Sequence, residues 1–135
     1  MPFLEWTEKN KTNVKTCDDQ HKKLFQLVNT LYDAMKEGKG NDVMKKILDE
    51  LVGYTAYHFS TEENLMQKYN YPGLVWHKKE HEDLAKKAKE LKEKSDKGEF
   101  IISSEVLSFL KNWLNTHTMG SDRKYGEFLN NKGIF

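Results

Sequence analysis

Cysteine and proline are both scarce in this chain of 135 residues. The single cysteine, Cys17, cannot form an internal disulfide, so a disulfide-stabilised small domain is excluded and a reducing compartment is favoured. The two prolines both lie outside the periodic segments described below. Because proline interrupts helices and the chain is rich in Lys, Glu, Leu and Asp, the composition favours a mostly helical protein.

The chain also lacks an excess of charge of either sign and any long hydrophobic run. Lysine and arginine number 22 against 21 acidic residues, so no strong overall field attracts nucleic acid or an anionic membrane. No apolar run is long enough to span a bilayer, and the opening residues 1–6 lack the basic start and apolar stretch of a secretory signal. We therefore expect a cytoplasmic protein that binds neither nucleic acid nor membranes.

Four segments carry apolar residues at helical spacing. The first begins at residues 16–19, Thr-Cys-Asp-Asp, which have the pattern of a capping box, and it ends at the glycines of residues 38–40. The others begin near Asn41, Leu74 and Ser103 or Ser104. Four amphipathic helices with short connections predict an all-α fold, an up-down-up-down antiparallel four-helix bundle.

The first 15 residues have no sustained period but are too apolar for a free tail. We expect them to form an extended arm packed against the bundle. The length is typical of one domain, so the sequence predicts a single domain over residues 1–135, with the arm at 1–15 and the bundle at 16–130.

All five histidines of the chain fall on the inward faces of these helices: His21, His58, His77, His81 and His117. Any one of them could be an ordinary buried histidine bonded to a neighbour. Burying five without a strongly bound partner would cost several kcal/mol, at roughly 1–3 kcal/mol for each unpaired group. A shared metal centre would remove that cost.

The spacing of these residues supports one centre. Glu62 lies four residues after His58, and His81 four after His77, so each pair stacks on one helix face. In an antiparallel bundle all five histidines and Glu62 fall at the same end. Asp122 lies five residues after His117, a spacing that requires local unwinding of the helix, for which Gly120 is well placed.

Five imidazoles and two carboxylates exceed the four ligands of a structural zinc site, so two metal ions are the natural number. Ferritin-like di-iron enzymes use Glu-x-x-His motifs and a majority of carboxylates. The imidazole majority here should instead keep ferrous iron accessible, which favours binding oxygen over cleaving it.

Together, these stretches resemble the signature of the bacterial hemerythrin domains: residues 18–21 (Asp-Asp-Gln-His), 58–63 (His-Phe-Ser-Thr-Glu-Glu) and 77–81 (His-Lys-Lys-Glu-His), followed by His117 and Asp122. The match covers nearly the whole chain. The resemblance implies an oxo- or hydroxo-bridged non-haem di-iron centre that binds dioxygen reversibly, for storage, delivery or sensing.

The resemblance also implies an assignment of the ligands. One iron would be held by His77, His81 and His117, and the other by His21 and His58, with Glu62 and Asp122 bridging both. The second iron would then have one vacancy, where dioxygen would bind.

Three other readings of the sequence compete with this one. A di-iron oxidase or peroxidase would turn over oxygen, peroxide or nitric oxide at the same vacancy. A sensory module of a larger receptor is disfavoured because the chain begins at Met1 and has no linker, and a zinc-stabilised bundle is the simplest structural alternative. We expect a monomeric oxygen-binding protein that is not an enzyme, with an oxygen-consuming enzyme or a reductase as its candidate partner.

The chain departs from the family pattern at Thr118, where a large aliphatic residue is usual, and at Cys17, where Ile or a similar residue is usual. We expect the Thr118 hydroxyl to hold a water or donate a hydrogen bond into the oxygen pocket and so to speed autoxidation. We expect Cys17 to act as a small hydrophobic residue that fills space.

Overall fold

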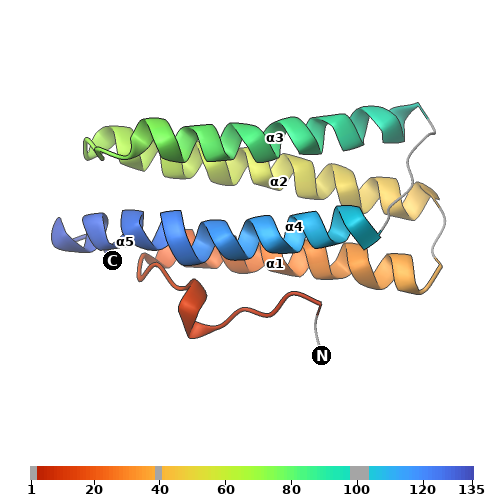
Figure 1. The fold of residues 1–135 in the computed structure, drawn as a ribbon, viewed down its shortest axis with the longest axis horizontal. Coiled ribbons are helices and arrows are strands. Elements are labelled where there is room, and N and C mark those ends of the chain that lie inside the picture. Colours follow the sequence, from red (N-terminus) through yellow and green to blue (C-terminus); the bar gives the residue numbers. More distant parts are fainter. Residues whose placement is uncertain (1–2, 39–40, 98–103) are drawn as a thin grey trace.

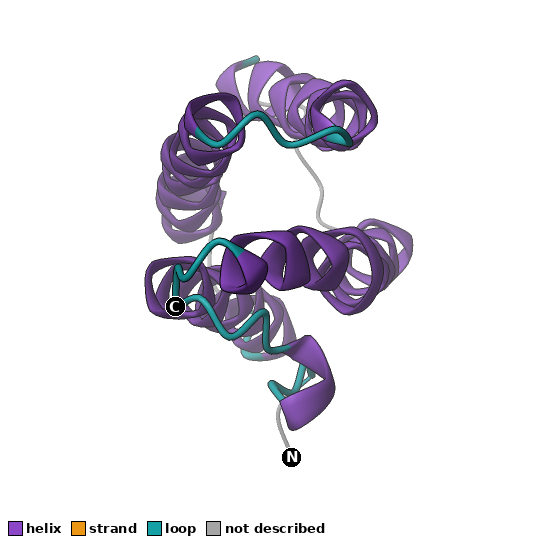
Figure 2. Cartoon of the chain, turned by 90° about the vertical axis from the view of Figure 1, so that its left-hand side faces the viewer, coloured by secondary structure: helices purple, strands orange, loops and turns teal. Residues whose placement is uncertain are grey.

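The computed structural model describes residues 3–38, 41–97 and 104–135, and all regular secondary structure in these ranges is helical. The long helices α1 (Lys15–Lys36), α2 (Asn41–Lys68), α3 (Leu74–Asp96) and α4 (Ser104–His117) run antiparallel to their neighbours in one bundle (Figure 1). Seen from the end, α2 and α3 form the upper pair and α1 and α4 the lower pair (Figure 2). The predicted four-helix bundle is confirmed. Residues 39–40 and 98–103, which include the predicted end of the first helix and Ser103, lie outside the described residues.

The apolar stripes of the helices meet inside the bundle. The larger core cluster runs along the bundle and includes Leu24, Val28, Leu31, Leu48, Leu51, Leu84, Leu107, Leu110 and Leu114. A smaller cluster comprises Val14, Cys17, Met66, Tyr125 and Leu129. Each fully buried aliphatic or aromatic side chain contributes roughly 1.5–3 kcal/mol, so these stripes account for most of the driving force for assembly.

Beyond α4 the helix changes its winding. The segment η2 (Thr118–Asp122) is π-helical, and α5 (Arg123–Asn131) resumes the α-helical geometry. A π-helix has i to i+5 hydrogen bonds and is wider than an α-helix. The local unwinding predicted between His117 and Asp122 is therefore confirmed.

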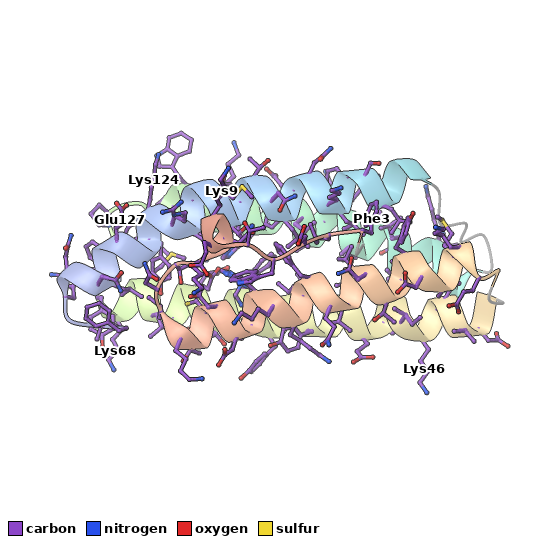
Figure 3. The ribbon with its side chains drawn as sticks, turned by 90° about the horizontal axis from the view of Figure 1, so that it is seen from below. Phe3, Lys9, Lys46, Lys68, Lys124 and Glu127 are labelled. Atoms are coloured by element: carbon purple, nitrogen blue, oxygen red, sulfur yellow. The ribbon has the colours of Figure 1, made fainter. Side chains whose placement is uncertain are left out.

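The arm packs along the bundle, as predicted. Figure 3 shows residues 3–14 lying in the groove between α1 and α4. Leu4 is fully buried there, and its backbone exchanges two hydrogen bonds with the side-chain amide of Asn29 on α1 (2.7 and 2.8 Å). The arm also contains a short 3-10 helix, η1 (Glu8–Asn10), that the sequence pattern did not predict.

The predicted capping box at residues 16–19 is wrong. Helix α1 begins at Lys15, and no side chain caps its first turn. The Asp18 carboxylate instead accepts hydrogen bonds from the backbone N–H groups of Thr12 and Asn13 and from the Thr12 hydroxyl. The residues just before α1 are not helical, so their N–H groups lack helical partners, and the Asp18 carboxylate pairs with them in place of a helix cap.

None of the described helices is long and apolar enough to cross a membrane.

Candidate metal centre

Seven side chains that the sequence singled out lie in one buried layer. All five histidines and both carboxylates, Glu62 and Asp122, are at most 4% exposed. They come from every long helix and from η2: His21 from α1, His58 and Glu62 from α2, His77 and His81 from α3, His117 from α4 and Asp122 from η2. The structure therefore brings all of the predicted site residues together.

The seven side chains form two groups that share Glu62. One group contains Glu62, His77, His81, His117 and Asp122, and the other contains His21, His58 and Glu62. Within each group the donor atoms all lie within 4.8 Å of one another, which is close enough for one metal ion to contact every member.

Asp122 reaches both groups. Its Oδ1 lies 2.8 Å from Nε2 of His77 and 3.0 Å from Nε2 of His117. Its Oδ2 lies 3.0 Å from Nε2 of His21. The two oxygens of this carboxylate therefore face histidines of different groups.

Glu62 has a similar arrangement. Its Oε1 lies 3.1 Å from Nε2 of His81 and 3.4 Å from Nε2 of His58, while its Oε2 lies 3.3 Å from Nε2 of His21. Both carboxylates thus lie between the two groups of histidines, as a ligand shared by two ions would.

Several of these atoms are close to one another without forming hydrogen bonds. Among the described residues, both oxygens of Glu62 and of Asp122, and Nε2 of His21 and of His77, are buried and have no hydrogen-bond partner. Leaving one such group unpaired costs roughly 1–3 kcal/mol. Metal ions in this layer would satisfy all of these atoms at once, so the residues present fit a metal centre.

Three histidines have a polar partner on the ring nitrogen that faces away from the layer. Nδ1 of His58 lies 2.7 Å from Gln20, Nδ1 of His81 lies 3.0 Å from Glu63, and Nδ1 of His117 lies 3.3 Å from Glu80. The hydrogen bonds of His58 and His81 fix the ring orientation and the tautomer, and the ionic contact of His117 with Glu80 favours the same orientation, which leaves each Nε2 free to bind a metal.

These three partners were not predicted from the sequence. Gln20 directly precedes His21, and Glu80 directly precedes His81, yet each serves a histidine on another helix. The sequence shows only that each of these residues is next to a predicted ligand. Which histidine it contacts depends on how the helices pack.

The two carboxylates are ionised in the metal-free protein. Burial opposes ionisation of Glu62, but His58, His21 and His77 hold its pKa well below the ordinary value. Burial and the charge of Glu62 oppose ionisation of Asp122, and His117 and His21 outweigh both and lower its pKa.

The histidines respond in the opposite direction. Burial disfavours the charged imidazolium, but the carboxylates of Asp122 and Glu62 outweigh it and raise the pKa of His21 to about 10. The pKa of His117 is raised to about 10 against burial, by Asp122 and Glu80 above all, and that of His77 is also raised. Burial dominates at His58 and lowers its pKa. Protons therefore partly neutralise the cluster when metal is absent.

Aromatic rings surround the layer. Phe59 stacks on the ring of His81 at 3.9 Å between centroids, and Trp113 stacks on His117 at 4.4 Å. These contacts hold the imidazoles in place and help to keep bulk water out of the layer.

Thr118 does not behave as expected. Its hydroxyl donates a hydrogen bond to the carbonyl of Leu114 (2.8 Å) and accepts one from the side-chain amide of Asn10 (2.9 Å). The expectation that this hydroxyl offers a hydrogen bond to the oxygen pocket is therefore wrong, because its proton is already used within the helix.

Cys17 is fully buried in the smaller core cluster. Burial, with the nearby carboxylates of Glu62 and Asp122, raises the pKa of its thiol well above the ordinary value. A neutral, enclosed thiol matches the expected role of a small hydrophobic side chain.

Comparison with known proteins identifies close relatives. The family model for the hemerythrin HHE cation binding domain matches residues 12–129. The bacteriohemerythrin of Methylococcus capsulatus is 36% identical over 130 residues, covering 96% of this chain and 98% of that protein. The myohemerythrin of Sipunculus nudus is 34% identical over 124 residues, covering 92% of this chain and 91% of that protein. A crystal structure of wild-type hemerythrin superposes with a TM-score of 0.88 at 36% identity, covering 94% of this chain and 98% of that one.

Proposed function

This chain belongs to the hemerythrin family, and on that premise we propose that it binds dioxygen reversibly at a pair of iron ions. The observation that carries the proposal is the donor set, in which five imidazoles and two carboxylates from every long helix and η2 form two adjoining groups. A majority of neutral nitrogen ligands stabilises ferrous iron, the state that binds dioxygen.

The proposed ligands follow the two groups. His77, His81 and His117 would hold one iron and His21 and His58 the other, with Glu62 and Asp122 shared by both. The bridging roles are supported by the carboxylate oxygens of Asp122, which face His77 and His117 on one side and His21 on the other. When bound, the iron pair would supply the electrons and the binding site for dioxygen.

The chain contributes orientation and exclusion of water. Gln20, Glu63 and Glu80 contact the Nδ1 atoms of three imidazole rings, on the side away from the candidate metal centre. These rings therefore need little rearrangement when metal binds. The layer lies between the two apolar core clusters, which keep solvent from reaching it. A low-polarity surrounding limits the access of water and protons, which promote the oxidation of ferrous iron by dioxygen.

We propose binding without turnover, so that the protein is not an enzyme. Cleaving the O–O bond requires protons, and the thiol of Cys17 and the phenol of Tyr125 are protic groups close to the two carboxylates. Burial raises the pKa of both groups, so neither gives up a proton readily.

Location and partners follow the same proposal. The only cysteine is buried and free, which fits a reducing cytoplasm. We propose that the protein acts as a monomer and exchanges dioxygen or electrons with an oxygen-consuming enzyme or a reductase.

Metal analysis combined with an absorption titration tests the proposed function. Protein loaded with ferrous iron under anaerobic conditions should contain two irons per chain and develop an absorption band with oxygen that disappears on deoxygenation. Prompt conversion to an oxidised form that deoxygenation does not reverse would support the oxidase or peroxidase alternative. A single ion per chain would refute the di-iron centre.

A further inference from the structure

The π-helical segment η2 determines whether Asp122 can join the site. In an α-helix, a residue five positions after His117 would point about 140° away from it around the helix axis. In the structure the Asp122 carboxylate lies 3.0 Å from His117. Because π-helical turns are rare and seldom persist without support, some other part of the chain must stabilise this one.

The hydroxyl of Thr118 is the first support. It is buried, and it donates to the carbonyl of Leu114, one turn earlier in α4. Asn10 is the second support. Its side-chain amide donates to the Thr118 hydroxyl at 2.9 Å and to the Asn115 side chain at 3.4 Å, both at the junction of α4 and η2.

Asn10 is itself held rigidly in the arm. Its side-chain oxygen accepts hydrogen bonds from the backbone N–H and the hydroxyl of Thr7, at 2.9 and 3.1 Å. The residue is fully buried, and both halves of its amide are occupied. An amide fixed in this way orders the group that it contacts.

The arm is also fastened to α1 on both sides of Asn10. Leu4 is bonded to Asn29, and Thr12 and Asn13 are bonded to Asp18. The arm therefore connects α1, which carries His21, to η2, which carries Asp122. The same two residues meet across the site at 3.0 Å.

We infer that residues 3–14 form a clamp that holds η2 in its π-helical form, and that Asn10 is a positioning residue for Asp122. This inference rests on the proposed function in so far as Asp122 is a metal ligand. Asn10 makes no hydrogen bond to any of the seven side chains of the candidate metal centre, and it acts through Thr118. Figure 3 shows the path of the clamp between α1 and α4.

The test compares Asn10→Ala with Asn29→Ala. Each change removes a side-chain amide that fixes the arm to the bundle: a buried one at Asn10 and a partly buried one at Asn29. Asn29 holds Leu4, at the end of the arm remote from η2. Thr118→Val is the second variant, since it removes the hydroxyl while keeping nearly the same shape. Two quantities are measured on the full chain: hydrogen exchange of the amides of residues 118–122, and affinity for ferrous iron by anaerobic competition with a chelator.

We expect Asn10→Ala and Thr118→Val to speed exchange in residues 118–122 and to weaken iron binding by roughly 10–100-fold, the range for loss of a group that orients a ligand. Asn29→Ala loosens only the far anchor of the arm and leaves the hydrogen bonds of Asn10 to Thr7 and Thr118 in place, so it should change both quantities much less. The clamp is refuted if Asn10→Ala and Thr118→Val change neither quantity, or if Asn29→Ala changes both equally. A wild-type protein that binds no iron pair would instead refute the proposed function, and the exchange comparison would still decide whether the clamp exists.

Discussion

Metal binding should expel protons from the cluster, and the pKa values of the histidines set their number. In the metal-free protein His21 and His117 have pKa values of about 10, so both are almost fully protonated at pH 7. A metal binds only the neutral imidazole. Loading should therefore release at least two protons per chain, with a further contribution from His77, whose pKa is also raised.

The cost of this release is large enough to measure. Each pKa unit above the buffer pH corresponds to about 1.4 kcal/mol, so deprotonating His21 or His117 at pH 7 uses roughly 4 kcal/mol of metal-binding energy. The apparent binding constant should rise roughly tenfold per pH unit for every proton released. A release of two protons thus gives a rise of about 100-fold between pH 6 and pH 7.

Calorimetry can count the protons. Ferrous iron is titrated anaerobically into metal-free protein at pH 7 in two buffers with different ionisation enthalpies, and the difference in heat gives the number released. His117→Gln should release about one proton fewer. His58→Gln is the matched control, because burial lowers the pKa of His58 and leaves it neutral before metal binds. Release of less than one proton by the wild-type chain would refute this reasoning.

The same pKa values predict how stability depends on pH. The raised folded pKa of His21 and His117 contributes stability that is fully present below pH 6.5 and is lost as the pH rises through about 10. The lowered pKa values of Glu62 and Asp122 contribute stability that is present above pH 4.5 and is lost as the pH falls. The melting temperature of the metal-free protein should therefore be highest between pH 4.5 and pH 6.5. The increase in melting temperature caused by iron should become larger from pH 6 to pH 9. Equal melting temperatures with and without iron would contradict this prediction.

Three further substitutions, the last with a matched control, test the ligand assignment, the role of the thiol and the packing of the arm. Glu62→Ala should abolish binding of the iron pair because it removes a bridging carboxylate; metal analysis that still found two irons, together with an oxo-bridge absorption band, would show that the ligand assignment is wrong. Cys17→Ile should leave the reversible dioxygen band unchanged, and loss of that band would make the thiol functional. Gly126→Ala should lower the free energy of unfolding by roughly 1–3 kcal/mol in urea titrations, because an added Cβ would lie 2.3 Å from the Thr12 carbonyl oxygen. Gly53→Ala, where a Cβ meets nothing within 4 Å, should be neutral or stabilising by up to about 1 kcal/mol, and an equal loss in both variants would argue against the close approach of the arm.

Periodicity in the sequence was enough to predict the bundle and the burial of the five histidines. An apolar stripe shows which face of a helix is buried, so a histidine on that stripe is predicted to point inward. The antiparallel topology then places His21, His58, His77, His81 and His117 at one end. Each of these steps depends only on spacing within a helix and on short connections, which the sequence displays directly.

Contacts made by the arm could not be predicted in this way. Asn10 and Thr118 are 108 positions apart, and neither lies in a pattern that identifies a partner. The same holds for Asp18, whose neighbours suggested a helix cap although its carboxylate satisfies loop amides. Polar side chains in irregular segments bind whichever buried group lacks a partner, and that depends on the assembled fold.

The position of Asp122 shows how the winding of the helix unites the site. Its spacing sets this residue apart from the other predicted ligands, because it lies five residues after His117 and not four. A π-helical turn contains one residue more than an α-helical turn, so five positions across η2 correspond to four along an α-helix. The pair His117 and Asp122 therefore has the same geometry as His58 with Glu62. The alignment continues into α5, where Tyr125 and Leu129 follow Asp122 by three and seven residues and are fully buried. The extra residue in η2 thus brings the Asp122 carboxylate into the layer of histidines. It also lets α5 keep its apolar face against the core.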